Sequence, residues 1–91
     1  MWCRTAVALL IGGGCCLTSP ARALEKPEFC RAYAKAAVAS ARENVRLKCG
    51  LTGSRYSPSW QLHYGWCMSA GRGSVAGERN IRMSELQACR R

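Results

Sequence analysis

The segment from Pro27 to Lys48 reads PEFCRAYAKAAVASARENVRLK and is followed by Cys49 and Gly50. Proline suits the first position of a helix, glutamate is favourable beside the N-terminus, and glycine commonly follows the last turn. We therefore predict a helix over residues 27–48. At 100° per residue, its small and apolar residues share one arc: Cys30, Tyr33, Ala34, Ala37, Ala41 and Val45, with Val38 at the border. This stripe is predicted to face the core.

The same helix carries four basic residues within an arc of about 60°, away from the centre of the apolar stripe. We call them the basic strip: Arg31, Lys35, Arg42 and Arg46. Such a strip can attract an anionic surface, although its commoner role is to keep a small domain soluble.

Two further helices are predicted after this one. Residues 50–57 form a turn-rich connector, after which Ser57 is expected to cap a helix that has Pro58 at its first position and ends near Ser69. Residues 70–77 are expected to be a flexible joint, and a third helix is expected from about Gly77 to Arg90. The prediction is a small all-α domain of three helices.

The N-terminal residues have the three-part order of a secretory signal peptide. Arg4 is followed by an uncharged apolar run over 5–17, and then by Ala21-Arg22-Ala23, a small-x-small cleavage pattern. The run is too short to span a bilayer. We therefore predict a signal peptide over 1–23 and one mature domain over 24–91. The alternatives are a buried helix over 5–17, and a lipid-modified Cys15 or Cys16.

Export changes the meaning of the cysteines. Of the seven in the chain, three lie in the predicted signal peptide, which leaves Cys30, Cys49, Cys67 and Cys89. An even number in a short exported chain indicates a disulfide framework. The mature chain has 68 residues, which is 91 less 23. A core of that size is marginal, so crosslinks worth about 2–5 kcal/mol each are physically reasonable.

The pairing is constrained by helix geometry. In a continuous helix, Cys30 and Cys49 would be about 28 Å apart, whereas bridged Cα atoms lie within about 7 Å. An up-down-up arrangement of three helices favours Cys30 with Cys67 and Cys49 with Cys89. The alternative of Cys30 with Cys89 and Cys49 with Cys67 remains open.

The charge of the mature domain is strongly positive. Loss of Arg4 and Arg22 leaves 12 of the 14 basic residues against five glutamates, a net charge of +7. This excess favours anionic partners without specifying one. We expect a periplasmic or secreted protein with no transmembrane segment in the mature chain, and we do not expect a nucleic-acid partner.

No constellation in the sequence points to catalysis. A Ser-His-Asp triad is impossible because aspartate is absent. His63 and Cys67 are four residues apart and could join the other cysteines around zinc, but an oxidising compartment disfavours free thiolates. Glu43, Glu78 and Glu85 are interpreted as surface charges that balance arginines. We expect no enzymatic activity, no cofactor and no metal.

Residues 55–66 concentrate aromatic side chains. The candidates for docking on a partner are Tyr56, Trp60 and Trp66. Aromatic groups that alternate with cations can stack on sugars or bases. The simpler interpretation is that Trp60, Tyr64 and Trp66 fill the core against an alanine-rich helix. His63 is expected to be a hydrogen-bonded structural residue.

The assembled pattern spans nearly the whole mature chain: Cys30-x-x-Tyr33-Ala34, Ala37-Val38, Asn44, Cys49-Gly50-x-x-Gly53-x-Arg55-Tyr56, His63-Tyr64-x-Trp66-Cys67, Glu78, Arg82, Leu86 and Cys89. It resembles a group of small exported four-cysteine proteins from alphaproteobacteria that are generally labelled uncharacterised. Its more specific parts are the Cys-Gly and His-aromatic-x-Trp-Cys segments. The resemblance implies a bacterial periplasmic or secreted location and transfers no functional residue.

Two functions follow as hypotheses. The first is a non-enzymatic exported binding module that contacts anionic cell-envelope material through the basic strip. The second is an accessory subunit that docks on a larger envelope protein through its aromatic segment. A cationic membrane-active peptide is less consistent with charges placed on a crosslinked fold.

Overall fold

The computed structural model describes residues 25–91, so the predicted signal peptide and its cleavage site lie outside the described residues. The described chain forms α1 (Lys26–Arg46), a short 3₁₀ helix η2 (Ser54–Tyr56), α2 (Trp60–Ser69) and α3 (Arg72–Arg90), with no strand among them. The prediction of a small all-α domain with three helices is confirmed.

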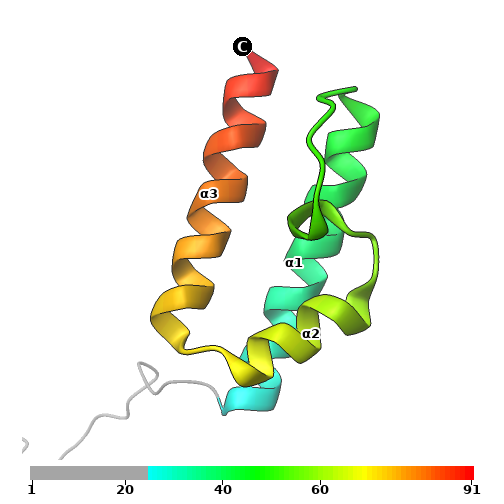
Figure 1. Ribbon diagram of the computed structural model, residues 1–91. Helices are drawn as coiled ribbons and strands as arrows, with labels where there is room; N and C mark the ends of the chain where they lie inside the picture. The colour runs from blue at the N-terminus through cyan, green and yellow to red at the C-terminus, as the bar shows by residue number, and fades with distance from the viewer. Residues whose placement is uncertain (1–24) are drawn as a thin grey trace, which may run out of the picture.

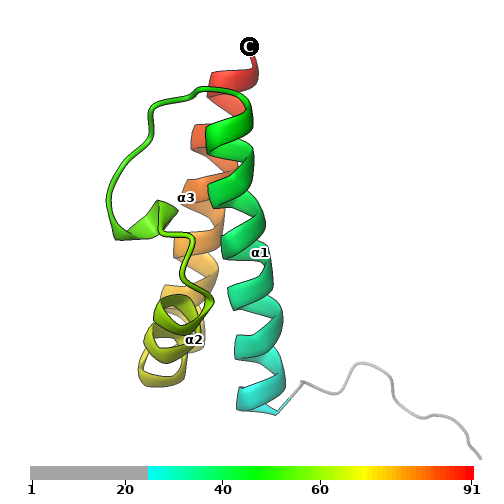
Figure 2. The same cartoon turned by 90° about the vertical axis from the view of Figure 1, so that its right-hand side faces the viewer.

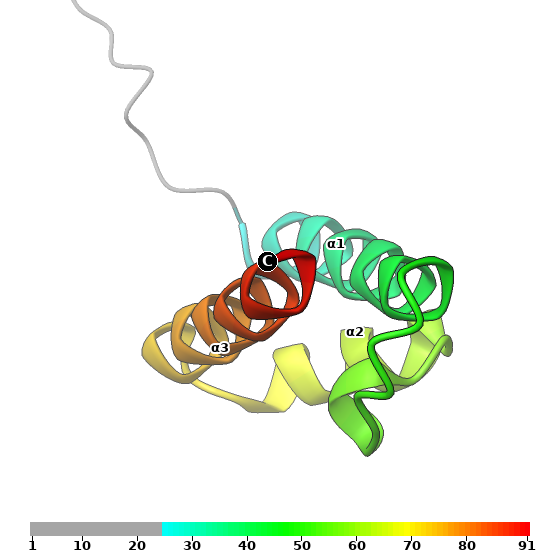
Figure 3. The same ribbon diagram turned by 90° about the horizontal axis from the view of Figure 1, so that it is seen from above.

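Helices α1 and α3 run side by side in the same direction, and α2 lies across the end where both of them begin (Figure 1). The connector from α1 descends through η2 to reach α2, and the C-terminus lies at the end of the molecule where α1 also ends (Figure 2). Seen from above, α1 and α3 lie side by side, with α2 and the connector on one side of them (Figure 3). We call the end that holds α2 the base, and the opposite end the top. The second helix was expected to run back along α1. The connector covers most of that distance instead, and α2 forms only the last part of the path.

The core lies at the base. Its buried cluster is Cys30, Tyr33, Ala37, Cys67 and Val75, with Phe29, Tyr64 and Ala70 packed against it. The predicted stripe of α1 is buried except at Val45, which is 75% exposed. Asn44 is buried instead, because its side chain faces the connector and bonds the backbone of Leu51.

Helix α1 ends two residues before the predicted position. The N–H of Lys48 donates to the carbonyl of Val45 and that of Cys49 donates to the carbonyl of Asn44, which is a Schellman motif. Lys48 takes the left-handed conformation with φ 56°, which glycine would adopt at lower cost. The predicted role of Gly50 is thus performed by Lys48, and Gly50 has positive φ in the turn that follows.

Helix α2 begins at Trp60, and its cap is Ser59, not Ser57. The Ser59 hydroxyl accepts a hydrogen bond from the Leu62 N–H at 3.2 Å. Ser57 follows the last residue of η2, and its N–H donates to the carbonyl of Ser54. The Ser57 hydroxyl instead accepts from the N–H of Ser59.

Helix α3 begins at Arg72, five residues earlier than predicted, and the expected joint over 70–77 is mostly helical. Gly73 and Gly77 weaken a helix by about 1 kcal/mol each. Val75 lies between them and is 1% exposed in the core cluster, so its burial outweighs the local propensity.

Both expected disulfides are present. The Cα atoms are 5.5 Å apart in Cys30–Cys67 at the base and 5.8 Å apart in Cys49–Cys89 at the top. Among the described helices, none is long and apolar enough to cross a membrane.

Candidate binding surfaces

A cleft of about 600 Å³ opens between the connector, α2 and α3. Residues 52–55 form one wall, and Leu62, His63 and Trp66 of α2 contribute another part of the lining. Tyr33 of α1 and Glu78 of α3 complete the lining. The volume falls within the range of small-molecule sites, about 300–1,000 Å³.

The two tryptophans of the described chain are partly exposed. Trp66 is 39% exposed and its ring centroid lies 5.7 Å from that of Tyr33, whereas Trp60 is 36% exposed and stacks on Tyr64 at 4.8 Å. The expectation that both tryptophans belong to the core is wrong. The buried positions of α2 are held by His63 and Cys67 instead.

Tyr56 does not offer a docking surface. It is 7% exposed, and its hydroxyl donates to Glu85 at 2.8 Å. Burial, together with the Glu85 carboxylate, raises the pKa of Tyr56 to about 12. Of the three aromatic docking candidates, only Trp60 and Trp66 are accessible, and only Trp66 lines the cleft.

His63 has the structural role expected of it. It is 3% exposed, and its Nε2–H donates to the carbonyl of Ser57 at 2.7 Å, which leaves Nδ1 as an acceptor in the neutral ring. The Cys67 sulfur is bonded to Cys30. Over residues 25–91, no three His, Cys, Asp or Glu side chains gather in a way that could hold a metal ion.

Arg55 connects the connector to α3. Its Nε lies 2.5 Å from Oε2 of Glu78 and its Nη2 lies 3.3 Å from Oε1, while its Nη1 lies 3.5 Å from the Glu85 carboxylate. The bond to Glu78 raises the pKa of Arg55. Sequence reasoning missed this pair because 23 residues separate its members.

Arg82 is a buried cation behind the cleft. It is 1% exposed, and its Nη1 donates to the Tyr33 hydroxyl at 2.9 Å. Among the described residues, its Nε and Nη2 have no hydrogen-bond acceptor. The helical period places Arg82 on one face with Val75 and Leu86, which are also buried. That spacing was the available signal for a buried arginine.

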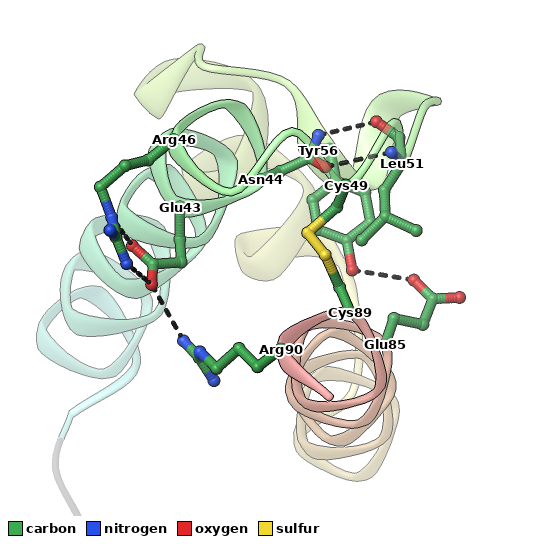
Figure 4. The surroundings of a disulfide bond; sticks show 9 residues. All are labelled: Glu43, Asn44, Arg46, Cys49, Leu51, Tyr56, Glu85, Cys89 and Arg90. Carbon is green, nitrogen blue, oxygen red and sulfur yellow. Dashed lines mark hydrogen bonds and ion pairs between the residues drawn. A yellow bond between two sulfur atoms is a disulfide. The ribbon is translucent and has the colours of Figure 1, made fainter.

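All four residues of the basic strip are exposed, but they are not equally paired. Arg46 binds Glu43 through two hydrogen bonds of 3.0 and 2.7 Å, and Arg90 of α3 reaches the same carboxylate at 3.2 Å (Figure 4). The other three form no ion pair with any residue of 25–91: Arg31, Lys35 and Arg42.

The glutamates predicted to balance arginines do so. Glu43 pairs with Arg46 and Arg90, and Glu78 and Glu85 both face Arg55. The bonds from Arg46 and Arg90 lower the pKa of Glu43 to about 2. These pairs compensate charge around the connector and at the top. They leave Arg31, Lys35 and Arg42 of the basic strip without an acidic partner among residues 25–91.

Comparison of the chain with protein-family models, curated proteins and solved structures finds no match. The resemblance to small exported four-cysteine proteins therefore stays a prediction.

Proposed function

We propose that the domain is a non-enzymatic binding module, periplasmic or secreted, that contacts anionic cell-envelope material through the basic strip. One observation carries the proposal. Arg31, Lys35 and Arg42 are exposed and have no ion-pair partner among residues 25–91, while three of the five glutamates are bound to other arginines.

The geometry of α1 suits a flat or linear anionic partner. The strip extends about 22 Å along one helix face, from Arg31 to Arg46, at 1.5 Å per residue. The helix is supported on its opposite side by the core and by the Cys30–Cys67 bridge. A preformed face loses little conformational freedom on binding, and each basic residue near an anionic surface contributes about 1 kcal/mol.

The test compares two triple charge reversals that have the same net charge. The strip triple reverses the uncompensated part of the basic strip and consists of Arg31→Glu, Lys35→Glu and Arg42→Glu. The control triple reverses exposed residues elsewhere and consists of Lys48→Glu, Arg79→Glu and Arg91→Glu. Sedimentation with vesicles of phosphatidylglycerol and phosphatidylcholine measures the partition coefficient. The strip triple is expected to bind about a hundredfold more weakly than wild type, and the control triple within about tenfold of it.

Salt provides the second arm of this test. Binding through exposed charges weakens as the Debye length falls from about 10 Å at 0.1 M salt to about 3 Å at 1 M. Equal loss in the two triples, or binding that ignores salt, would contradict the proposal.

The accessory-subunit function remains a second candidate, because Trp60, Leu62, Trp66 and Met68 expose between 36% and 44% of their surface on one short helix. Copurification with one stable envelope protein, abolished by Trp66→Ala and retained by the strip triple, would favour this function over the first.

A further inference from the structure

Two guanidinium groups beside the cleft are unequally satisfied. Arg55 faces two carboxylates, Glu78 and Glu85, whereas the buried Arg82 has only the hydroxyl and ring of Tyr33. A buried cation without a carboxylate is costly, and each unmet N–H adds to that cost. Arg55 thus has two acidic partners, whereas Arg82 has none among residues 25–91.

Glu78 is placed to serve either arginine. It precedes Arg82 by four residues on α3, the spacing and order in which glutamate and a basic residue pair best on a helix. Its side chain is 21% exposed, and the Arg55 side chain is 33% exposed at the cleft wall. Glu85 is less free to exchange, because it also accepts the Tyr56 hydroxyl.

From these contacts we infer that the cleft binds the C-terminal carboxylate of a peptide whose last side chain is apolar. The ligand carboxylate replaces Glu78 on Arg55, and Glu78 turns to Nε and Nη2 of Arg82. Arg55 then binds the ligand carboxylate beside Glu85, and Arg82 gains a carboxylate, so that charge-assisted hydrogen bonds form where its N–H groups had no acceptor. This site is separate from the basic strip and does not rest on the function proposed above.

The rest of the lining fits the end of a peptide. Leu62 is 44% exposed and Trp66 is 39% exposed, so they offer an apolar wall for the last side chain. On the facing wall, the backbone N–H groups of residues 52–54 donate to no described residue. Uncommitted N–H groups beside a cation are the elements by which other proteins capture a peptide C-terminus.

The test uses an acetylated tripeptide that ends in phenylalanine, as the free acid and as the C-terminal amide. Calorimetry with the disulfide-bonded protein is expected to give about tenfold tighter binding of the acid, since only the acid makes charge-assisted bonds to Arg55. Arg55→Gln is expected to remove this preference. Octanoate, a carboxylate without a peptide backbone, is expected to bind about tenfold more weakly than the peptide acid.

Two variants separate exchange from structural damage. Glu78→Gln removes the group that competes for Arg55, so the acid is expected to bind a few-fold more tightly, which a damaged fold would not do. The Arg82 Nε–H resonance is expected to move downfield when the acid binds the wild type, and to stay in place in Glu78→Gln. Glu43→Gln alters an ion pair outside the cleft and is the matched control, with binding unchanged.

Three results would overturn the inference. The first is equal affinity for the acid and the amide, including the case in which neither binds at millimolar concentration. The second is wild-type affinity for the acid in Arg55→Gln. The third is an Arg82 resonance that the acid does not move. If octanoate binds as tightly as the peptide acid, the inference that the cleft binds a peptide is wrong.

Discussion

The base and the top of the domain are each closed by one disulfide, but the two bridges have different surroundings. Cys30 and Cys67 are fully buried beside Tyr33, Ala37 and Val75. Cys49 is half-buried and Cys89 is exposed, and their neighbours form polar contacts (Figure 4). These contacts are the Asn44 bonds to Leu51, the Tyr56–Glu85 bond and the Glu43 ion pairs.

This contrast indicates how so small a domain stays folded at both ends. Apolar packing is concentrated where α2 meets α1, and it is sparser where α3 runs beside α1. At the top, hydrogen bonds, ion pairs and the Cys49–Cys89 disulfide take the place of apolar packing. We therefore expect the base to respond to changes in volume, and the top to changes in hydrogen bonding, backbone conformation and charge.

The largest effect is expected from removing either disulfide. The two bridges close loops of similar length, with sequence separations of 37 and 40, so the chain-entropy model assigns each about 4 kcal/mol. Cys30→Ala with Cys67→Ala should cost a further 1–2 kcal/mol or so, because it also leaves a cavity in the core. Cys49→Ala with Cys89→Ala should not carry this extra cost, because Cys49 is only half-buried and Cys89 is exposed.

Urea unfolding of the two double variants measures the difference in free energy of unfolding directly. Since loop entropy nearly cancels between them, the difference reports the local surroundings. Equal losses at the two sites would contradict the contrast between a packed base and a polar top.

A smaller loss is expected from Asn44→Ala at the top. Its side-chain amide donates to the Leu51 carbonyl at 2.7 Å and accepts from the Leu51 N–H at 3.0 Å, and the residue is 8% exposed. Both backbone groups would lose their partner, at a cost of about 2 kcal/mol. Asn80→Ala on the exposed face of α3 is the control, and it should change the free energy of unfolding by less than about 0.5 kcal/mol.

The sequence predicted the parts of this contrast that depend on local pattern and chain geometry. The length of α1, most of its buried stripe, the disulfide pairing and the parallel course of the first and third helices follow from periodicity and reach. The predictions that failed depend on tertiary contacts. Val75 is buried in the core, so α3 begins five residues earlier than its glycines favour, and His63 and Cys67 hold the buried positions of α2 in place of Trp60 and Trp66.

The candidate sites divide in the same way. The basic strip is a property of one helix, so a helical wheel finds it. The cleft joins residues from the connector and three helices, and no local pattern brings Arg55 to Glu78 or Tyr33 to Arg82. Arg82 on the apolar side of α3 was the one sequence signal that a polar group is buried there.

A gain in stability is expected from Lys48→Gly. Lys48 has φ 56° at the end of α1, a conformation that costs a side-chain-bearing residue about 1 kcal/mol. Glycine removes that cost and keeps both Schellman hydrogen bonds, so the midpoint of urea unfolding should rise. Gly50→Ala is the reciprocal test, because φ is 72° and a Cβ there would meet no atom within 4 Å. Its loss should come from backbone conformation alone, and a loss in both variants would contradict this account of the turn.

The smallest effect is expected from acid titration of Glu43. Its pKa is about 2 in the folded chain against an ordinary value of 4.5, because Arg46 and Arg90 bind the carboxylate. The unfolded chain therefore takes up the proton first, so the contribution of Glu43 is complete above pH 4.5 and disappears as the pH falls towards 2. Wild type and Glu43→Gln should differ in free energy of unfolding at neutral pH and converge in this acid range. Because the pair is exposed, the gap should also narrow at about 1 M salt. If the two free energies of unfolding converge in acid but the gap between them does not narrow in salt, the stabilisation comes from the hydrogen bonds between α1 and α3. The top of the domain would then depend less on charge than its exposed surface indicates.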